Sequence, residues 1–411
     1  MTAYRPQLVR PRVLTASAIV FALLVPFVIH AAWDYAETWR LGKSIAAIRA
    51  DHEPLTTQEI HSAHILDGEA ADSARYYRAA AALAGSDAGA TSIRARVTEA
   101  LWSDEWPQAL VGDLRDRVAR DDDAFRLLDH ATPLAFDGFG PGNLNARIAE
   151  MLTLARLASL RTRLLAIEGD GNGAVASLYA ELRLQRTFDF DPVPSYLPGV
   201  TIAGLADSVG LIINRSRPDG AALARLAAPL RELDRDDRLK RRLLRMRAAI
   251  FDNRLDNWSL WRPWMLKLLN ERIETLGALI EGAGRPWPRP LDPPSGAYLP
   301  DSASERLFRE MDRGTMATVA IETAFIRCAR SVVAVERYRL DHAGALSPRI
   351  EDLAPAYLDA SPIDPFSGRP LRFVATSSGY IVYSVGRDRR DQGGRLARRD
   401  SPDLGIRIAR R

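Results

Sequence analysis

The amino-acid sequence predicts a mostly α-helical protein with an N-terminal transmembrane helix, an irregular array of helical hairpins and a C-terminal α+β module with a small antiparallel sheet. Three observations predict this class. An uncharged apolar run occupies residues 13–33, segments with helical periodicity fill residues 34–281, and strand-like residues gather only near the C-terminus. A linker rich in Pro and Gly at 282–301 precedes the module at 302–394, and an Arg-rich tail follows at 395–411.

The apolar run is long enough to form a membrane anchor. Its 21 residues, Val13 to Trp33, contain no Asp, Glu, Lys or Arg, and about 20 such residues let a helix cross a bilayer core of about 30 Å. Three arginines precede the run and Asp34 follows it. The positive-inside rule therefore places residues 1–12 in the cytoplasm and residues 34–411 on the other side of the membrane.

A cleaved signal peptide is the alternative reading of this run, because a charged segment also precedes the apolar part of a signal peptide. Cleavage after Ala31 or Ala32 would put Ile29 or His30 where a small residue is needed. We therefore expect an uncleaved single-pass anchor, with the bulk of the chain beyond the membrane. The residues expected at the membrane interface are Trp33, Tyr35 and Trp39.

The region after the anchor has helical periodicity and few strand signals. Its segments are joined by short connections that contain Gly, Pro and Asp, which favours antiparallel helical hairpins without a fixed repeat length. We expect helices at about 36–50, 70–83, 107–130, 143–168, 174–187, 196–214, 219–233, 236–251 and 258–280.

The linker contains a run of alternating prolines, which excludes regular helix and favours extended structure. A helix from about Thr315 to Leu340 opens the module and carries an apolar stripe that includes Cys328 and Val332. A short helix is expected at Ser347-Pro348, where Ser provides the N-cap. A β-hairpin is expected beyond it, with Phe373, Tyr380 and Val382 facing the long helix.

Two motifs frame this hairpin and carry a resemblance to a known family. The Pro-rich turn SPIDPFSGRP at 361–370 and the segment SVGRD at 384–388 stand before and after it. Together with the order of helix, turn, hairpin and Gly-rich loop, they resemble the globular part of the major pseudopilins of type II secretion systems. The resemblance covers about a fifth of the chain. The layout as a whole resembles single-span bacterial envelope proteins, which implies an anchor in the inner membrane of a bacterium and a periplasmic bulk but no activity.

The chain departs from the pseudopilin pattern in two ways. Nothing at its N-terminus matches the processing site of a pseudopilin, and the helix of the module carries Glu322, Arg327 and Arg330. Such a helix is not the membrane-embedded stalk of a fibre subunit. The resemblance therefore implies a pseudopilin-like head placed at the end of another protein.

The resemblance also implies a calcium site in the loop after the hairpin, where major pseudopilins bind this ion through carboxylates and backbone carbonyls. The matching residues are Asp388 and Asp391, with Asp400 and Asp403 as later candidates. Several arginines, among them Arg387, Arg389 and Arg390, crowd the same loop and would repel a dication. The alternative is a solvated loop with local Arg–Asp pairing, which adds little to stability.

Trp258, Trp261 and Trp264 recur every third residue and would share one side of a helix. A stripe buried in the core is one interpretation of this spacing. Contact with a membrane interface or a partner protein is the other, with Arg262 and Lys267 placed to meet lipid headgroups.

Composition excludes several functional classes. The single Cys excludes an intrachain disulfide, and a net charge of +4 from 56 basic and 52 acidic residues does not indicate a nucleic-acid partner. No nucleophile elbow, phosphate loop, dinucleotide fingerprint or zinc-protease motif occurs. Two functions stay open. We expect a non-catalytic scaffold or interaction protein that associates with a type II secretion or pilus-like machine, and the alternative is an envelope enzyme with its site in a groove of the helical array.

Overall fold

The computed structural model confirms a mostly helical protein with a small antiparallel sheet. Twelve α-helices and three strands are present in the part of the chain that it describes. That part comprises residues 11–62, 68–84, 93, 96–97, 99–100, 106–134, 144–187, 196–252, 260–293, 303–396 and 402–409.

The helices of the N-terminal half are α1 (Pro11–Ala50), α2 (Thr57–Ser62), α3 (Gly68–Leu83), α5 (Gln108–Arg120), α6 (Asp122–Ala131), α7 (Leu144–Ile167) and α8 (Gly171–Thr187). Those that follow are α9 (Tyr196–Arg215), α10 (Gly220–Leu233), α11 (Arg238–Asp252), α12 (Arg262–Ala283) and α13 (Ala303–Asp341), with short 3-10 helices at Arg289–Leu291 and Ile350–Leu353. The strands are β1 (Arg372–Thr376), β2 (Gly379–Ser384) and β3 (Leu404–Ala409).

Several boundaries differ from the sequence-based expectation. One expected helix at 107–130 is two, α5 and α6, which meet at Asp121. The long helix of the module begins at Ala303, about a dozen residues earlier than expected. The short helix expected at Ser347 begins only at Ile350 and is a 3-10 helix. In the expected linker, Trp287 and Leu291 pack against buried clusters, so this stretch is part of the body.

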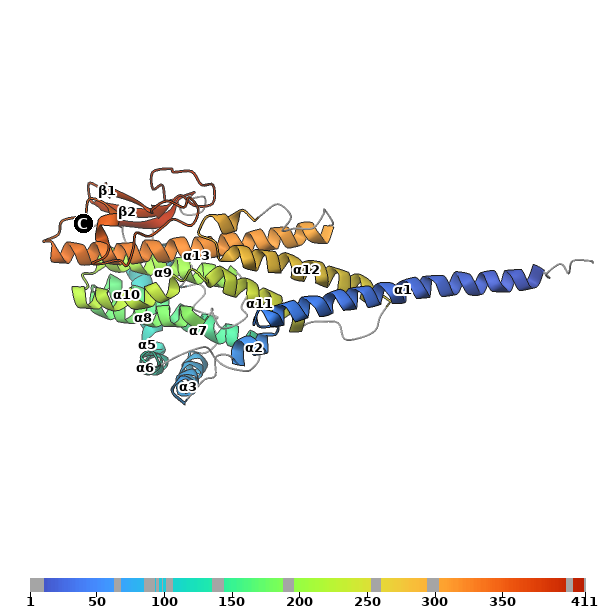
Figure 1. Cartoon of the computed structure of the whole chain (residues 1–411). Helices are drawn as coiled ribbons and strands as arrows, with labels where there is room; N and C mark the ends of the chain where they lie inside the picture. The colour runs from blue at the N-terminus through green and yellow to red at the C-terminus, as the bar shows by residue number, and fades with distance from the viewer. Residues whose placement is uncertain are drawn as a thin grey trace, which may run out of the picture.

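The long helix α13 lies between two layers (Figure 1). The sheet covers one side of α13, and α9 and α10 cover another, with α7 and α8 beyond them. The expected apolar stripe of α13 occupies this position: Cys328 and Val332 are fully buried. Helix α13 can contact two layers because buried residues occur on more than one of its faces.

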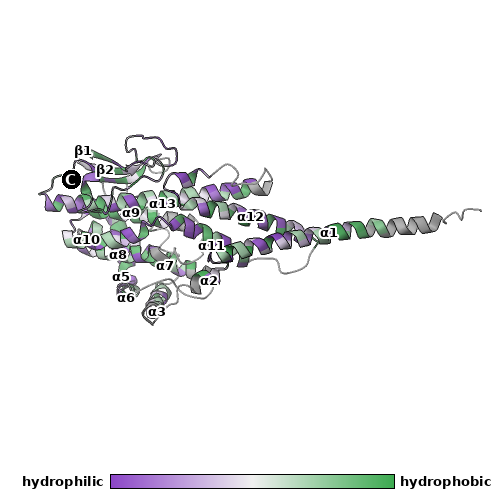
Figure 2. Cartoon of the chain, viewed as in Figure 1, coloured by the Kyte–Doolittle hydropathy of each residue, from purple (hydrophilic) through white to green (hydrophobic). Residues whose placement is uncertain are grey.

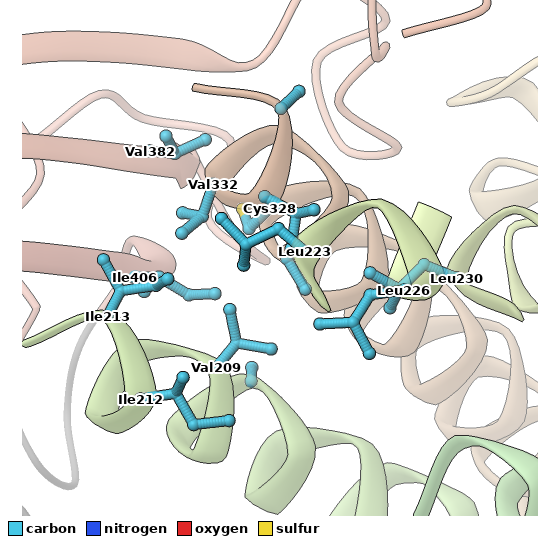
Figure 3. Close-up of a cluster of buried hydrophobic side chains, with 14 of the residues drawn as sticks. Val209, Ile212, Ile213, Leu223, Leu226, Leu230, Cys328, Val332, Val382 and Ile406 are labelled. Carbon is cyan, nitrogen blue, oxygen red and sulfur yellow. The ribbon is translucent and has the colours of Figure 1, made fainter. Parts of the chain in front are cut away.

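One continuous core joins the helical array to the C-terminal module. Figure 3 shows Leu223 of α10 beside Cys328 of α13, and Ile213 of α9 beside Ile406 of the sheet, with Val332 and Val382 in the same cluster. The expected boundary at 282–301 is therefore crossed by shared packing. The division of the chain into separate domains stays a prediction.

The sheet has the strand order β1-β2-β3, and both pairs are antiparallel. The hairpin is confirmed to within about a residue, and Tyr380 and Val382 are fully buried in the core as expected. The third strand is a correction. Leu404–Ala409 lie in the expected Arg-rich tail but pair with β2 along its whole length, because Ile406 and Ile408 bring apolar side chains to the shared core.

Buried ion pairs hold α11 and α12 against α13. Glu322 is fully buried and accepts hydrogen bonds from Arg242 at 2.9 and 3.1 Å and from Arg238 at 3.1 Å. Arg272 of α12 makes a two-pronged pair with Asp312, with both N–O distances at 2.6 Å. The charges that exclude a membrane-embedded stalk are thus the contacts that fix α13 within the protein.

Helix α1 leaves the body and projects beyond it as one unbroken helix (Figure 1). Within the part of the chain that the structure describes, none of the helices combines the length and the apolar character needed to cross a membrane. The expected anchor at 13–33 therefore lacks support from this structure. Its side chains at 13–20 lie outside the described residues.

Candidate functional site

Exposed apolar side chains gather where α1 leaves the body. On α1, Phe21, Leu24, Phe27, Val28 and Ile29 are each more than half exposed. The described residues of this projecting part appear as hydrophobic in Figure 2. Large apolar side chains that remain uncovered over such a length are unusual on a soluble surface and mark a place where another phase or molecule is bound.

Exposed aromatic side chains also lie where this projection meets the body. Tyr35 is 73% exposed and Trp39 57%, and Trp33 is 40% exposed. Next to them, at the start of α12, Trp261 is 70% exposed and Trp264 50%. We call these five residues, together with Leu260, the aromatic collar. The interpretation of the Trp cluster as a core stripe is therefore wrong for Trp261 and Trp264, while Trp258 lies outside the described residues.

Polar contacts fix the start of α12 beside α1. His30 Nε2 lies 2.9 Å from the carbonyl oxygen of Leu260, and Arg262 forms an ion pair with Asp34. Further along, the side chain of Asn270 donates to the carbonyl oxygen of Glu37 at 2.9 Å.

These contacts also set the direction of the two helices. Residues 30, 34 and 37 of α1 contact residues 260, 262 and 270 in that order, so α1 and α12 run parallel. The start of α12 is therefore the part of that helix nearest the exposed stretch of α1.

Most charged side chains around the collar have a partner of opposite charge. Besides the Arg262–Asp34 pair, Arg40 binds Glu274 at 2.6 Å, and Lys267 lies 3.8 Å from Glu271. Lys43 Nζ lies 3.7 Å from the centre of the Trp39 ring, a cation–π contact. The sequence-based idea that Arg262 and Lys267 face lipid headgroups as free cations is thus not supported by their pairing. The collar has exposed aromatic surface with little net charge.

The expected calcium ligands lie in the loop before β3, and the structure brings three of them together. Asp391 accepts hydrogen bonds from Tyr383 and from the backbone N–H of Gly393, and it pairs with Arg372 at 3.1 Å. These donors lower the pKa of Asp391, the backbone N–H of Gly393 most of all.

The other two carboxylates are engaged in the same way. Asp403 is buried and accepts from the N–H groups of Gly394 and Arg395 at 2.9 and 3.2 Å. Asp388 accepts from Gln392 and Arg390.

In this structure the described carboxylates of the loop are satisfied by protein donors. The carboxylates already accept hydrogen bonds from N–H and O–H donors, whereas calcium needs six to eight oxygen ligands directed at one point. Among the described residues no group of three or more His, Cys, Asp or Glu side chains is placed to hold a metal. Asp400 lies outside the described residues. Asp391 pairs with Arg372 of β1, and the loop arginine Arg389 pairs with Asp292, so these ion pairs reach beyond the loop. Calcium binding stays a prediction.

The Pro-rich turn has a structural centre at Asp364. This carboxylate is buried and accepts from Ser384 Oγ at 2.7 Å and from the N–H groups of Phe366 and Val385. It therefore joins the two motifs that carry the resemblance. Gly386 is required there, because its φ is +67° and a Cβ would lie 1.8 Å from the carbonyl oxygen of Pro402.

Sequence reasoning missed a buried carboxyl group, that of Glu181, and a half-buried one, that of Asp207, in the helical array. Burial raises the pKa of Glu181 on α8 to about 7 and that of Asp207 on α9 to about 6, with Arg163 of α7 acting in the opposite direction on both. No motif marks either residue. A signal was present for Glu181, which follows Ala174 and Leu178 on the apolar stripe of its helix.

A hollow of about 670 Å³ opens between α6, α7, α8 and α10, and neither Glu181 nor Asp207 is among its lining residues. Arg161 lines it and makes a two-pronged contact with Asp129, while its Nε lies 3.1 Å from Ser177 Oγ. Arg225 lines the opposite part. The hollow thus presents hydroxyl, guanidinium and apolar groups to a small molecule.

Comparison with known proteins gives no functional indication for these features. No protein-family model, no curated protein and no solved structure matches this chain.

Proposed function

We propose that this protein is a membrane-anchored, non-catalytic scaffold or interaction protein of the bacterial periplasm, held at the inner membrane by the N-terminal part of α1. The observation that carries the proposal is the projection of α1 from the body with Phe21, Leu24 and Phe27 uncovered. In the sequence, the uncharged run continues to Trp33, and Asp34 is the first acidic residue after it.

The length of the uncharged run supports this proposal. At 1.5 Å per residue, its 21 residues form a helix about 31 Å long, close to the thickness of a bilayer core. Trp33, Tyr35 and Trp39 then fall at the membrane surface, where aromatic side chains are enriched. Residues 1–12 carry three arginines, which favours a cytoplasmic N-terminus.

The C-terminal part supports a role in assembly. Helix α13, the turn around Asp364 and the β1–β2 hairpin follow one another in the order of a pseudopilin head. We propose that this module meets components of a type II secretion or pilus-like machine, while the array of α3 to α10 provides further surface for partners.

Membrane fractionation and reporter fusions test the anchor. The full chain should sediment with membranes and stay there in high salt, and a reporter fused after Arg411 should be active only in the periplasm. A variant with Leu24→Arg and Phe27→Arg should lose membrane association, because each charge placed in a bilayer core costs about 3 kcal/mol. Recovery of the unaltered chain in the soluble fraction would refute the anchor.

Co-purification tests the assembly role. The protein extracted in detergent should bring secretion or pilus components with it, and the variant Asp364→Ala, which removes the centre of the Pro-rich turn, should reduce their recovery. Recovery that is the same with and without the module would contradict a role for it.

The hollow at Arg161 supports an envelope enzyme as the second candidate function. Outside the lining of the hollow, Glu181 and Asp207 have raised pKa values on the neighbouring helices α8 and α9, and such groups occur at acid–base sites. A small molecule that binds there should raise the thermal midpoint of the full chain, and Arg161→Ala should abolish that gain. A search that finds turnover dependent on Glu181 would replace the scaffold proposal.

A further inference from the structure

The start of α12 exposes more apolar surface than a body surface usually does. Leu260 is 69% exposed, Trp261 70% and Trp264 50%. Each Trp side chain can bury about 150–250 Å² in a contact, at about 25 cal/mol for each Å² of apolar surface removed from water. Adjacent exposed residues of this kind mark a binding surface.

Contacts with α1 place these residues level with the end of the uncharged run. The imidazole of His30 meets the carbonyl oxygen of Leu260, and Asp34 pairs with Arg262. Residues 260–262 therefore lie level with residues 30–34 of α1. That is where the uncharged run ends at Trp33 and where, under the proposed function, the bilayer surface must lie.

Charge decides between kinds of membrane contact. A surface that binds anionic lipid by electrostatics presents unpaired Lys and Arg. Around the collar, Arg262, Arg40 and Lys267 each have an acidic partner. Attachment through this surface therefore depends on aromatic and aliphatic side chains, whose preferred location is the interface between headgroups and acyl chains.

We propose that Leu260, Trp261 and Trp264 enter the interfacial layer of the same phospholipid bilayer that α1 enters. This inference rests on the proposed membrane anchor and deepens it by adding a second attachment from the body. A single helix leaves the body free to swing, whereas two attachments on parallel helices hold it at one tilt. The occupant is the phospholipid interface, without a requirement for a particular headgroup charge.

The structural reason for this arrangement is the pairing of α1 with α12. Arg40 and Glu274 continue the contact beyond the collar, and Asn270 is fully buried against Glu37. The start of α12 is thus carried to the bilayer surface by a fixed helix pair and does not need to move to reach it.

Fluorescence quenching by brominated lipid tests the inference. The full chain is reconstituted into phosphatidylcholine vesicles that carry bromine near the headgroup end of the acyl chains, and the fluorescence of the unaltered protein is compared with that of Trp261→Phe/Trp264→Phe. The difference between them is the emission of these two residues. We expect brominated vesicles to quench this emission. Quenching should be weaker when the bromine atoms lie deeper in the acyl chains.

Two controls make the result specific. The emission that Trp106→Phe removes should be unaffected by bromine, because Trp106 packs against the core of the array. Quenching should also be the same with anionic lipid added and in high salt, since the surface has little net charge.

The outcomes separate this inference from the proposed function. Protein that floats with the vesicles while the Trp261/Trp264 emission stays unquenched overturns the inference and leaves the anchor in place. That outcome includes the case in which a partner protein covers the surface. Quenching that appears only with anionic lipid overturns the charge argument. Protein that does not float with vesicles overturns the anchor and the inference together.

Discussion

The buried carboxylate of Glu322 gives the sharpest test of how α13 is held in the protein. Its side chain is fully buried and accepts three hydrogen bonds from the guanidinium groups of Arg238 and Arg242, which are themselves nearly buried. Replacing it in Glu322→Gln keeps the size of the side chain and removes its charge. Two buried cations then lose their shared anion.

The size of the effect follows from the burial of the three groups. Removal of one partner of a buried ion pair costs about 3–5 kcal/mol, because the remaining charge is left in a medium of low polarity. Two arginines are affected here, so we expect a loss of about 5 kcal/mol in the free energy of unfolding. The matched control is Glu310→Gln on the same helix, whose side chain is 74% exposed and should change stability by less than about 1 kcal/mol.

Urea unfolding of the full chain in detergent, followed by far-UV circular dichroism, measures the free energy of unfolding of both variants. A triple variant in which Glu322→Leu is combined with Arg238→Met and Arg242→Met should recover much of the stability, since an apolar replacement of a whole buried network is often neutral. A loss below about 1 kcal/mol for Glu322→Gln would refute the claim that this network fixes α13. A triple variant no better than the single one would show that packing, and not charge, is at fault.

Three further predictions concern buried groups. The raised pKa of Glu181, about 7 in the folded protein against 4.5 in the reference state, means that the folded state retains a proton that the unfolded state releases. Its contribution to stability is therefore full below pH 4.5 and lost as pH rises through 7, so Glu181→Gln should gain stability relative to the parent at pH 8 but not at pH 4, as measured by unfolding midpoints. Burial raises the pKa of the Cys328 thiol, so the native protein should react with a thiol reagent only after unfolding, and fast labelling would contradict its position in the core. Asp364→Ala should cost about 3 kcal/mol, because several donors lose a charged acceptor, whereas a loss near zero would show that the turn does not depend on it.

Residue patterns predicted a good part of this fold for identifiable reasons. The hairpin was predictable because β-branched and aromatic residues flank the turn at Ser377–Gly379, and this preference acts over a few residues. The apolar stripe of α13 was predictable from its helical spacing. The strand β3 was missed, although Leu404, Ile406 and Ile408 alternate with other residues, because the surrounding arginines indicated an exposed tail.

The candidate site was less predictable. Spacing alone placed Trp261 and Trp264 on one side of a helix but did not show whether that side faces the core. Packing of α12 against α1 leaves them exposed. In the loop before β3, the resemblance indicated which aspartates come together, whereas the backbone N–H groups and Arg372 that engage them depend on how the loop closes.

By itself, the sequence determined the helical character of the chain, the uncharged run at 13–33 and the position of the hairpin, since each depends on neighbouring residues. Only the tertiary structure decided that Glu322 is buried with two arginines and that one core joins the array to the module. It also decided that the start of α12 lies beside residues 30–34 of α1. The physical reason is the distance along the chain over which each effect acts. Backbone preference and hydrophobic period act within a few residues, whereas these contacts join side chains that are tens to hundreds of residues apart and form only when whole helices pack.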